Sequence, residues 1–239
     1  TMLKRYILRK LTIDNLTVAD LNGDNSADSL DVTILKRYLL RKLSSFPVED
    51  IPKDERDEKV IKLENELKGD IIFSVPSGTF KNQVTVELSS KIPDAQIRYT
   101  VDGSVPAVSS KLYTGPLTFT TTTQLRAQSF VNGSASGDMG TAIYVASSID
   151  AEHDIPVLIL DAYGKGKPDR EYKDVAFILL EPRNNKVSLL QPATIVTRAG
   201  FHVRGQSSAN FEKTPYRLEL RDNKDDDAKY PMLGMPGDG

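Results

Sequence analysis

The 239-residue chain contains no cysteine and no tryptophan, and it has only 2 histidines. Without cysteine, the chain cannot form a disulfide framework, a thiolate zinc site or a cysteine nucleophile. The chain also lacks an excess of charge of one sign, because 31 Lys and Arg oppose 33 Asp and Glu for a formal net charge of −2. This balance argues against nucleic acid as a partner that the overall field of the protein would recruit.

Long hydrophobic runs are also missing. The longest are residues 155–160 and 175–180, whereas a membrane-spanning helix needs about 20 apolar residues. We therefore expect no membrane span. No signal peptide opens the chain, and residues 1–4 are typical of the middle of a helix, so we expect the natural start to lie upstream. The last segment stops without a terminating signal, and we expect it to continue as well.

An internal repeat is the first positive feature. Residues 1–11 (TMLKRYILRKL) match residues 33–43 (TILKRYLLRKL) with two conservative changes in eleven positions. In the second copy, Val32, Leu35 and Leu39 follow one helical stripe, and a basic stripe with a leucine at its centre lies beside it. A solvated helix face is the ordinary interpretation of such charges. Their duplication favours a surface that binds a partner.

An acidic loop precedes the second copy. It places oxygen ligands at positions 1, 3, 5, 7, 9 and 12 of a twelve-residue loop, the spacing that wraps a chain around Ca²⁺. Asn25 occupies position 6, where a left-handed turn is needed and asparagine is tolerated. A solvated acidic turn is the alternative, but the complete spacing favours calcium. The predicted ligands are Asp20, Asn22, Asp24, Ser26 (through its carbonyl), Asp28 and Asp31.

Loop and helix together resemble a type I dockerin, the calcium-dependent module that attaches cellulosomal proteins to cohesin domains of a scaffoldin. The resemblance covers residues 1–43 and implies two loop-helix repeats, of which the first lacks its loop here. It therefore implies one Ca²⁺ site in this chain, a second in an intact dockerin, and an extracellular or cell-surface location in a cellulosome. The cohesin-binding positions that it implies are Ser29, Leu30, Lys36, Arg37, Leu40 and Arg41, with Lys4, Arg5, Leu8 and Arg9 in the first copy.

Residues 44–69 are highly charged and punctuated by proline, which is typical of a linker. Within this stretch, Val60, Leu63 and Leu67 have the 3/4 spacing of a short helix. The pattern of apolar and polar residues changes after residue 70. Short alternating runs such as 84–88 are separated by turn signals, and this pattern predicts an antiparallel β-sandwich of the immunoglobulin or fibronectin III type.

Three strings of the sandwich region, FSVPSGTF, IRYTVDGSVP and YTGPL, resemble the immunoglobulin-like domain at the C-terminus of chitobiases and hexosaminidases. We assign this domain to residues 70–148. Tyr99 and Tyr113 could stack on a sugar ring, which would make the sandwich a carbohydrate-binding module. Tyrosines that fill the space between the sheets are the commoner explanation.

The last segment, 149–239, contains two alternating strands joined by a polar loop, and it predicts a hairpin with an ion-paired outer face. Its strings RGQSS, KTPYRLEL and LGMPGD resemble the opening of the spore-coat protein H (CotH) kinase-like family. That family implies ATP and divalent metal bound between lobes, with the metal-holding acids and the base beyond this chain. We therefore assign no catalytic residue, and we interpret residues 221–227 as a solvated turn. The resemblance implies phosphate binding by Gly205, Ser207, Ser208, Lys213 and Arg217.

The sequence thus predicts a multidomain, mainly β protein: a small all-α calcium-binding dockerin (1–43), a charged linker (44–69), an antiparallel β-sandwich (70–148) and a truncated α+β domain (149–239). Its expected function is calcium-dependent docking of a CotH-like protein onto a scaffoldin cohesin. An atypical protein kinase active only in a full-length chain is one alternative. A carbohydrate-binding accessory module with weak polysaccharide contact is the other.

Overall fold

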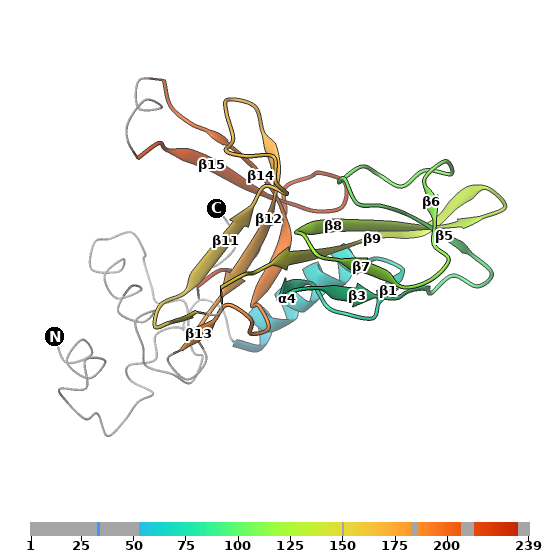
Figure 1. Ribbon diagram of the computed structural model, residues 1–239, viewed down its shortest axis with the longest axis horizontal. Coiled ribbons are helices and arrows are strands. Elements are labelled where there is room, and N and C mark those ends of the chain that lie inside the picture. The colour runs from blue at the N-terminus through green and yellow to red at the C-terminus, as the bar shows by residue number, and fades with distance from the viewer. Residues whose placement is uncertain (1–32, 34–52, 150, 183–185, 207–212, 234–239) are drawn as a thin grey trace.

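The structure is a computed structural model that describes residues 33, 53–149, 151–182, 186–206 and 213–233 (Figure 1). Apart from Thr33, the predicted dockerin at residues 1–43 lies outside the described residues, and so do its calcium ligands and its cohesin-binding positions. From residue 53 onward, the described part consists of one helix and two β bodies, and it is mainly β.

Helix α4 (Lys53–Lys68) confirms the helix predicted within the charged stretch. Leu67 is 5% exposed, and Leu63 packs against the core of the C-terminal sheet. An exposed ion pair between Lys62 and Glu66 and a partly buried one between Lys68 and Glu64 support the helix at i,i+4 spacing. The helix ends at Gly69, whose φ of 56° is the left-handed conformation that a C-terminal cap requires.

The sandwich confirms the predicted immunoglobulin-like fold. Its five-stranded sheet has the order β2-β9-β8-β5-β6, and the pairs β1–β4 and β3–β7 pack on it through a shared core. The pairs are antiparallel except β2–β9, which is parallel. The strands are β1 (Ile71–Phe73), β2 (Gly78–Phe80), β3 (Val84–Val86), β4 (Leu88–Ser90), β5 (Gln96–Thr100), β6 (Lys111–Leu112), β7 (Leu117–Phe119), β8 (Thr123–Val131) and β9 (Ser134–Ala146).

The core of the sandwich explains its tyrosines. Tyr99 and Tyr113 both pack against the buried cluster that contains Val86 and Leu125. The Tyr113 hydroxyl also accepts a hydrogen bond of 3.0 Å from the backbone N–H of Leu88. These two side chains therefore act as core residues, in agreement with the interpretation that the sequence favoured.

The C-terminal body is an antiparallel sheet of order β11-β12-β14-β15, with a small β10–β13 pair beside it. The described residues after 150 form strands and turns without a helix, so the helical part of the expected α+β domain is not seen there. The helix that packs on this sheet is α4, which precedes the sandwich in sequence. The strands are β10 (Glu152–His153), β11 (Val157–Asp161), β12 (Lys173–Leu180), β13 (Val187–Ser188), β14 (Ile195–Val203) and β15 (Tyr216–Arg221).

The central strand β12 is buried on both faces. On one face, Val175 and Phe177 join a core that α4 reaches through Leu63. On the other face, Ala176 and Ile178 form one core with Ile143 of the sandwich strand β9. A continuous apolar run is the pattern expected for a strand covered on both sides. The second sheet is therefore held against the sandwich by an apolar core, and Figure 1 shows the two sheets side by side.

The end of α4 approaches β9 at backbone distance. A Cβ atom at Gly140 would lie 2.3 Å from the carbonyl oxygen of Lys68, and one at Gly69 would lie 2.4 Å from that of Met139. Only glycine fits at two such positions, because both clashing atoms belong to the backbone. The two glycines therefore fix where the helix ends against the sheet.

Candidate functional site

The described residues contain part of the predicted phosphate-binding group. Gly205, Lys213 and Arg217 are described, whereas Ser207 and Ser208 lie outside the described residues. Gly205 and Arg217 line one open hollow of about 600 Å³ at the β14–β15 end of the second sheet, and Lys213 is not among its lining residues. We call this hollow the hairpin pocket. Its lining comprises Arg170, His202, Val203, Arg204, Gly205, Gln206 and Arg217.

Strand pairing places the basic side chains of the hairpin pocket. His202 of β14 pairs with Arg217 of β15 in an antiparallel register, as the predicted hairpin requires. Arg204 follows directly after β14, and its N–H donates to the Pro215 carbonyl at 2.9 Å. Gly205 then takes a φ of 85°, a left-handed conformation that suits glycine. Arg170 reaches over from the segment before β12 and donates to the carbonyl of Gly205.

The charge of the hairpin pocket is mainly positive. Three of its lining side chains are arginines. Arg217 also pairs with Glu219 at 2.8 Å, which confirms the ion pair expected on the hairpin's outer face. Beside it, the ring of Tyr172 lies 4.2 Å from that of His202 and 5.2 Å from the Arg221 guanidinium. Partial desolvation of this exposed side chain, together with a hydrogen bond to Glu219, raises the pKa of the Tyr172 phenol. Cationic side chains around a glycine turn can hold an anion.

The acidic stretch 221–227 is more than the solvated turn that the sequence predicted. Asp225, Asp226 and Asp227 are exposed, as expected. Asn223, however, points inward, and its amide donates to the carbonyls of Leu67 and Met139 at 2.8 Å each. It also donates to the carbonyl of Glu66 at 3.2 Å and accepts from the Thr141 hydroxyl at 2.6 Å. One side chain therefore connects α4, the sandwich and the turn after β15.

Two buried arginines lie beside Asn223. Arg126 of β8 is 1% exposed and donates to the carbonyls of Gly103 and Asn223. Arg198 of β14 is 3% exposed and pairs with Asp225 at 2.6 Å. Burial, with repulsion from Arg198, lowers the pKa of Arg126 to about 10. Sequence reasoning missed both residues, because a charged residue within an alternating strand is usually solvated.

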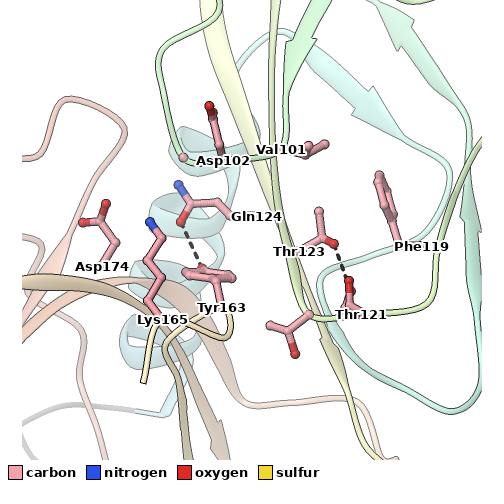
Figure 2. A pocket seen from close by; sticks show the side chains of 11 residues that line it. Val101, Asp102, Phe119, Thr121, Thr123, Gln124, Tyr163, Lys165 and Asp174 are labelled. Carbon is pink, nitrogen blue, oxygen red and sulfur yellow. Dashed lines mark hydrogen bonds between the residues drawn. The ribbon is translucent and has the colours of Figure 1, made fainter. Parts of the chain in front are cut away.

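A second hollow, of about 430 Å³, lies where the sandwich meets the C-terminal sheet, and we call it the interface pocket (Figure 2). The Tyr163 hydroxyl lies there and donates to Gln124 Oε1 at 2.9 Å. Burial raises the pKa of the Tyr163 phenol, and hydrogen bonds from Ser104 lower that of the Asp102 carboxyl. Sequence patterns carried no signal for this pocket. Its lining includes the polar side chains of Asp102, Gln124, Tyr163, Lys165 and Asp174.

Neither a membrane-spanning helix nor a cluster of metal ligands is present in the described part of the chain. None of its helices combines the length and apolar content that a membrane crossing demands. Within the same residues, no group of three or more acidic or histidine side chains could hold a metal ion. The predicted calcium ligands lie outside those residues, so their assignment stays a prediction.

No curated protein matches this chain. Among solved structures, a chimeric titin Z1Z2 functionalised with a KLER exogenous peptide from decorin is 10% identical, with 64% of this chain and 96% of that chain covered and a TM-score of 0.24. The titin domains Z1Z2 in complex with telethonin are 11% identical, with 64% and 95% covered and a TM-score of 0.23.

Two family matches are specific to regions of the sequence. Residues 1–40 match the dockerin type I domain, and residues 75–141 match the chitobiase/beta-hexosaminidase C-terminal domain. The second match falls within the immunoglobulin-like sandwich described above. The chain therefore carries a type I dockerin segment followed by a chitobiase/beta-hexosaminidase C-terminal immunoglobulin-like domain.

Proposed function

We propose that this chain docks onto a cohesin domain of a scaffoldin through its calcium-dependent dockerin, and so brings a CotH-like domain to a cellulosome outside the cell. The observation that carries the proposal is the dockerin match at residues 1–40. The complete ligand spacing of the loop from Asp20 to Asp31, which lies within that match, gives the chemical reason for calcium dependence. The proposal includes one Ca²⁺ in this chain.

Calcium would couple the loop to the helix that follows it. The carboxylates of the loop repel one another in the absence of a cation, and Ca²⁺ relieves this repulsion. Asp28 also stands where it can cap the N-terminus of the following helix. Ion binding would therefore order the helix that presents Lys36, Arg37 and Arg41 to the cohesin.

Isothermal titration of the chain against a scaffoldin cohesin, with Ca²⁺ and with excess chelator, tests this proposal. Binding should be tight with Ca²⁺ and should weaken at least about 100-fold with chelator. Asp24→Ala should have a similar effect, because it removes one charged ligand. Binding that ignores both the chelator and Asp24→Ala would overturn the role of calcium, and absence of binding to any scaffoldin cohesin would overturn the docking function.

Substitution of the basic surface tests which residues touch the cohesin. The double variant Lys36→Ala, Arg37→Ala should weaken docking about tenfold or more, and less if the first copy can substitute. Adding Lys4→Ala and Arg5→Ala removes that substitute and should abolish docking. Lys42→Ala is the matched control, since it removes a lysine of the same helix outside the proposed contact set. Equal effects of Lys42→Ala and the double variant would contradict the assignment.

Phosphate binding in the C-terminal region is a second candidate function, and it accords with an atypical CotH-type kinase. The hairpin pocket supports it, because Gly205 and Arg217 lie there with two further arginines. Phosphoryl transfer also needs metal-holding acids and a base, so activity is proposed only for a chain that includes them. ATP and inorganic phosphate should bind this chain weakly, with a loss of about fivefold or more in Arg217→Ala and none in the exposed control Lys186→Ala. Transfer of labelled phosphate by the extended chain, and not by this one, would support the kinase; its absence would contradict it.

A further inference from the structure

The interface pocket contains a buried amide with an unused hydrogen-bonding end. Gln124 of β8 is 2% exposed, and its Oε1 accepts the hydrogen bond from the Tyr163 hydroxyl at 2.9 Å. Its Nε2 has no hydrogen-bond partner among the described residues. The opposite amide orientation would leave Oε1 without one instead, since a single hydroxyl faces the group. A buried polar atom without a partner costs about 1–3 kcal/mol, so a ligand that supplies the partner would gain from binding there.

The unpartnered nitrogen faces the same space as a carboxylate from the other sheet. A Cβ atom built on Gly103 would lie 3.6 Å from Gln124 Nε2 and 3.8 Å from Asp174 Oδ2. Both atoms therefore converge on the surface of Gly103, which itself adopts a φ of 87°. Figure 2 shows Lys165 beside Asp174, and Asp102 above the Gln124 amide. The lining of the hollow therefore includes both donors and acceptors.

Tyr163 is held in an unfavourable backbone conformation at this site. Its φ is 52°, in the left-handed region that a bulky residue seldom occupies. The Asp161 carboxylate holds it there by accepting from the Tyr163 N–H at 2.7 Å, and it also accepts from the Thr122 hydroxyl at 3.0 Å. Such conformations cost about 1–3 kcal/mol and gather at ligand sites. Here the conformation directs the phenol onto the Gln124 amide, so that one end of the amide has a partner and the other has none.

The charges of the pocket select the chemical class of the ligand. Asp102 and Asp174 supply negative charge, Lys165 supplies positive charge, and the Arg221 guanidinium lies 3.3 Å from Asp174. This mixture favours neither a strong anion nor a strong cation. Hydroxyl groups suit it, because each can donate to a carboxylate and accept from an ammonium or an amide. The ring of Phe119 also lines the hollow, on the side away from Lys165 and Asp174.

We propose that the interface pocket binds the end of a saccharide chain, with one or two sugar rings between the sandwich and the C-terminal sheet. The volume of about 430 Å³ is within the usual range for small-molecule sites. Sugar hydroxyls would accept from Gln124 Nε2 and Lys165 Nζ and donate to the Asp174 carboxylate. This site is separate from Tyr99 and Tyr113, which belong to the core. It depends neither on calcium nor on docking.

Saturation-transfer NMR on the whole chain tests the proposal, with glucose, xylose, galactose, N-acetylglucosamine and their β-1,4-linked disaccharides as probes. At least one probe should bind with a Kd of about 1 mM or lower, because the site supplies several charged hydrogen bonds. The same probe should shift the side-chain Nε2 resonance of Gln124 in a ¹⁵N spectrum. Failure of every probe to bind at about 20 mM would overturn the proposal.

Matched variants separate this site from adventitious sugar contacts. Lys165→Ala and Asp174→Asn should each weaken binding about tenfold, since each removes a charge-assisted hydrogen bond. Lys167→Ala is the control for Lys165→Ala, because Lys165 and Lys167 are both exposed on one loop and only Lys165 lines the pocket. Lys165 carries the test if other variants fail to fold, since it is a surface residue. Equal binding by Lys165→Ala and Lys167→Ala, or a Gln124 resonance unmoved at saturation, would overturn the proposal.

Discussion

The central strands of the two sheets, β8 and β12, are both buried on both faces, but they achieve burial differently. β12 presents apolar side chains to each side, with Phe177 and Ile178 at 1% and 0% exposure. β8 presents Leu125 and Ala127 to the sandwich core and Gln124 and Arg126 to the opposite side. Apolar burial needs no specific partner, whereas each polar atom of β8 needs its own.

The difference shows what each strand contributes to the contact between the sandwich and the C-terminal sheet. Where β9 meets β12, contact is apolar and tolerant of direction. Around β8, Arg126 donates to the carbonyl of Asn223 and the Tyr163 hydroxyl donates to Gln124. Both hydrogen bonds form only in one relative placement of the two sheets. The apolar contact therefore supplies most of the affinity between the bodies, and the polar contacts fix their orientation.

The largest expected effect is on the apolar strand. Phe177→Ala should lower the free energy of unfolding by about 3–5 kcal/mol, because it removes buried surface and leaves a cavity. Urea unfolding followed by circular dichroism measures this. Leu158→Ala, at a position that is 49% exposed on the neighbouring strand β11, is the control and should cost under about 1 kcal/mol. Equal losses would mean that β12 is not the apolar centre of the sheet.

Asn223→Ala tests the polar side of the comparison. The change should cost about 2–4 kcal/mol, since it leaves the carbonyls of Leu67 and Met139 without their donor. Differential scanning calorimetry should show the loss. Lys224→Ala alters the exposed neighbour in the same turn and should stay within about 0.5 kcal/mol. If both variants lose the same free energy of unfolding, the polar contacts do not fix the relative orientation of the two sheets.

The alkaline stability of the protein gives a smaller effect. Burial raises the pKa of Tyr230 from 10.0 to about 12. Between these values the folded state keeps a proton that the unfolded state has lost, so stability falls as pH rises through this window. Tyr230→Phe removes this titrating group. The decrease in the free energy of unfolding between about pH 9 and 11 should therefore be smaller in the variant by about 1 kcal/mol. Urea unfolding at both pH values measures it, and an unchanged loss would contradict the burial of the phenol.

The smallest effect is expected at the exposed ion pair of the hairpin. The Arg217 side chain is 61% exposed and pairs with Glu219 at 2.8 Å. Because solvent screens such pairs, Arg217→Ala should cost under about 1 kcal/mol, and less still in about 1 M salt. Thermal denaturation at low and high salt provides the measurement. A larger, salt-independent loss would show that this polar pair resembles the buried contacts of β8.

Sequence patterns predicted those parts of the fold that depend on local order. The alternating runs predicted the sandwich, the 3/4 spacing of Leu63 and Leu67 predicted α4, and the strands around residue 204 predicted the β14–β15 hairpin. Patterns could not predict the positions of Asn223 or Gln124, because their partners lie far away in sequence: Leu67 is 156 positions from Asn223, and Tyr163 is 39 from Gln124. No local period encodes such pairs.

The candidate sites divide in the same way. Fixed spacing predicted the calcium ligands, and the dockerin match covers all but a few of the residues assigned to that module. Their geometry lies outside the described residues, so the individual ligands and cohesin contacts remain predictions. The hairpin pocket unites Gly205 and Arg217 of the predicted phosphate group. Arg170, which comes from a different segment, could not have been added without the fold.

The close approach of Gly69 and Gly140 has a mechanical consequence for an assembled complex. Because those glycines let the end of α4 lie directly against β9, the helix belongs to the same body as the sandwich and does not lengthen the connection to the dockerin. Only residues 44–52 separate the proposed dockerin module (1–43) from the first residue of α4, Lys53. These nine residues, fully extended, span roughly 30 Å. In a docked complex, the sandwich and the C-terminal sheet would therefore stay within about that distance of the dockerin, and so at a high local concentration near the scaffold.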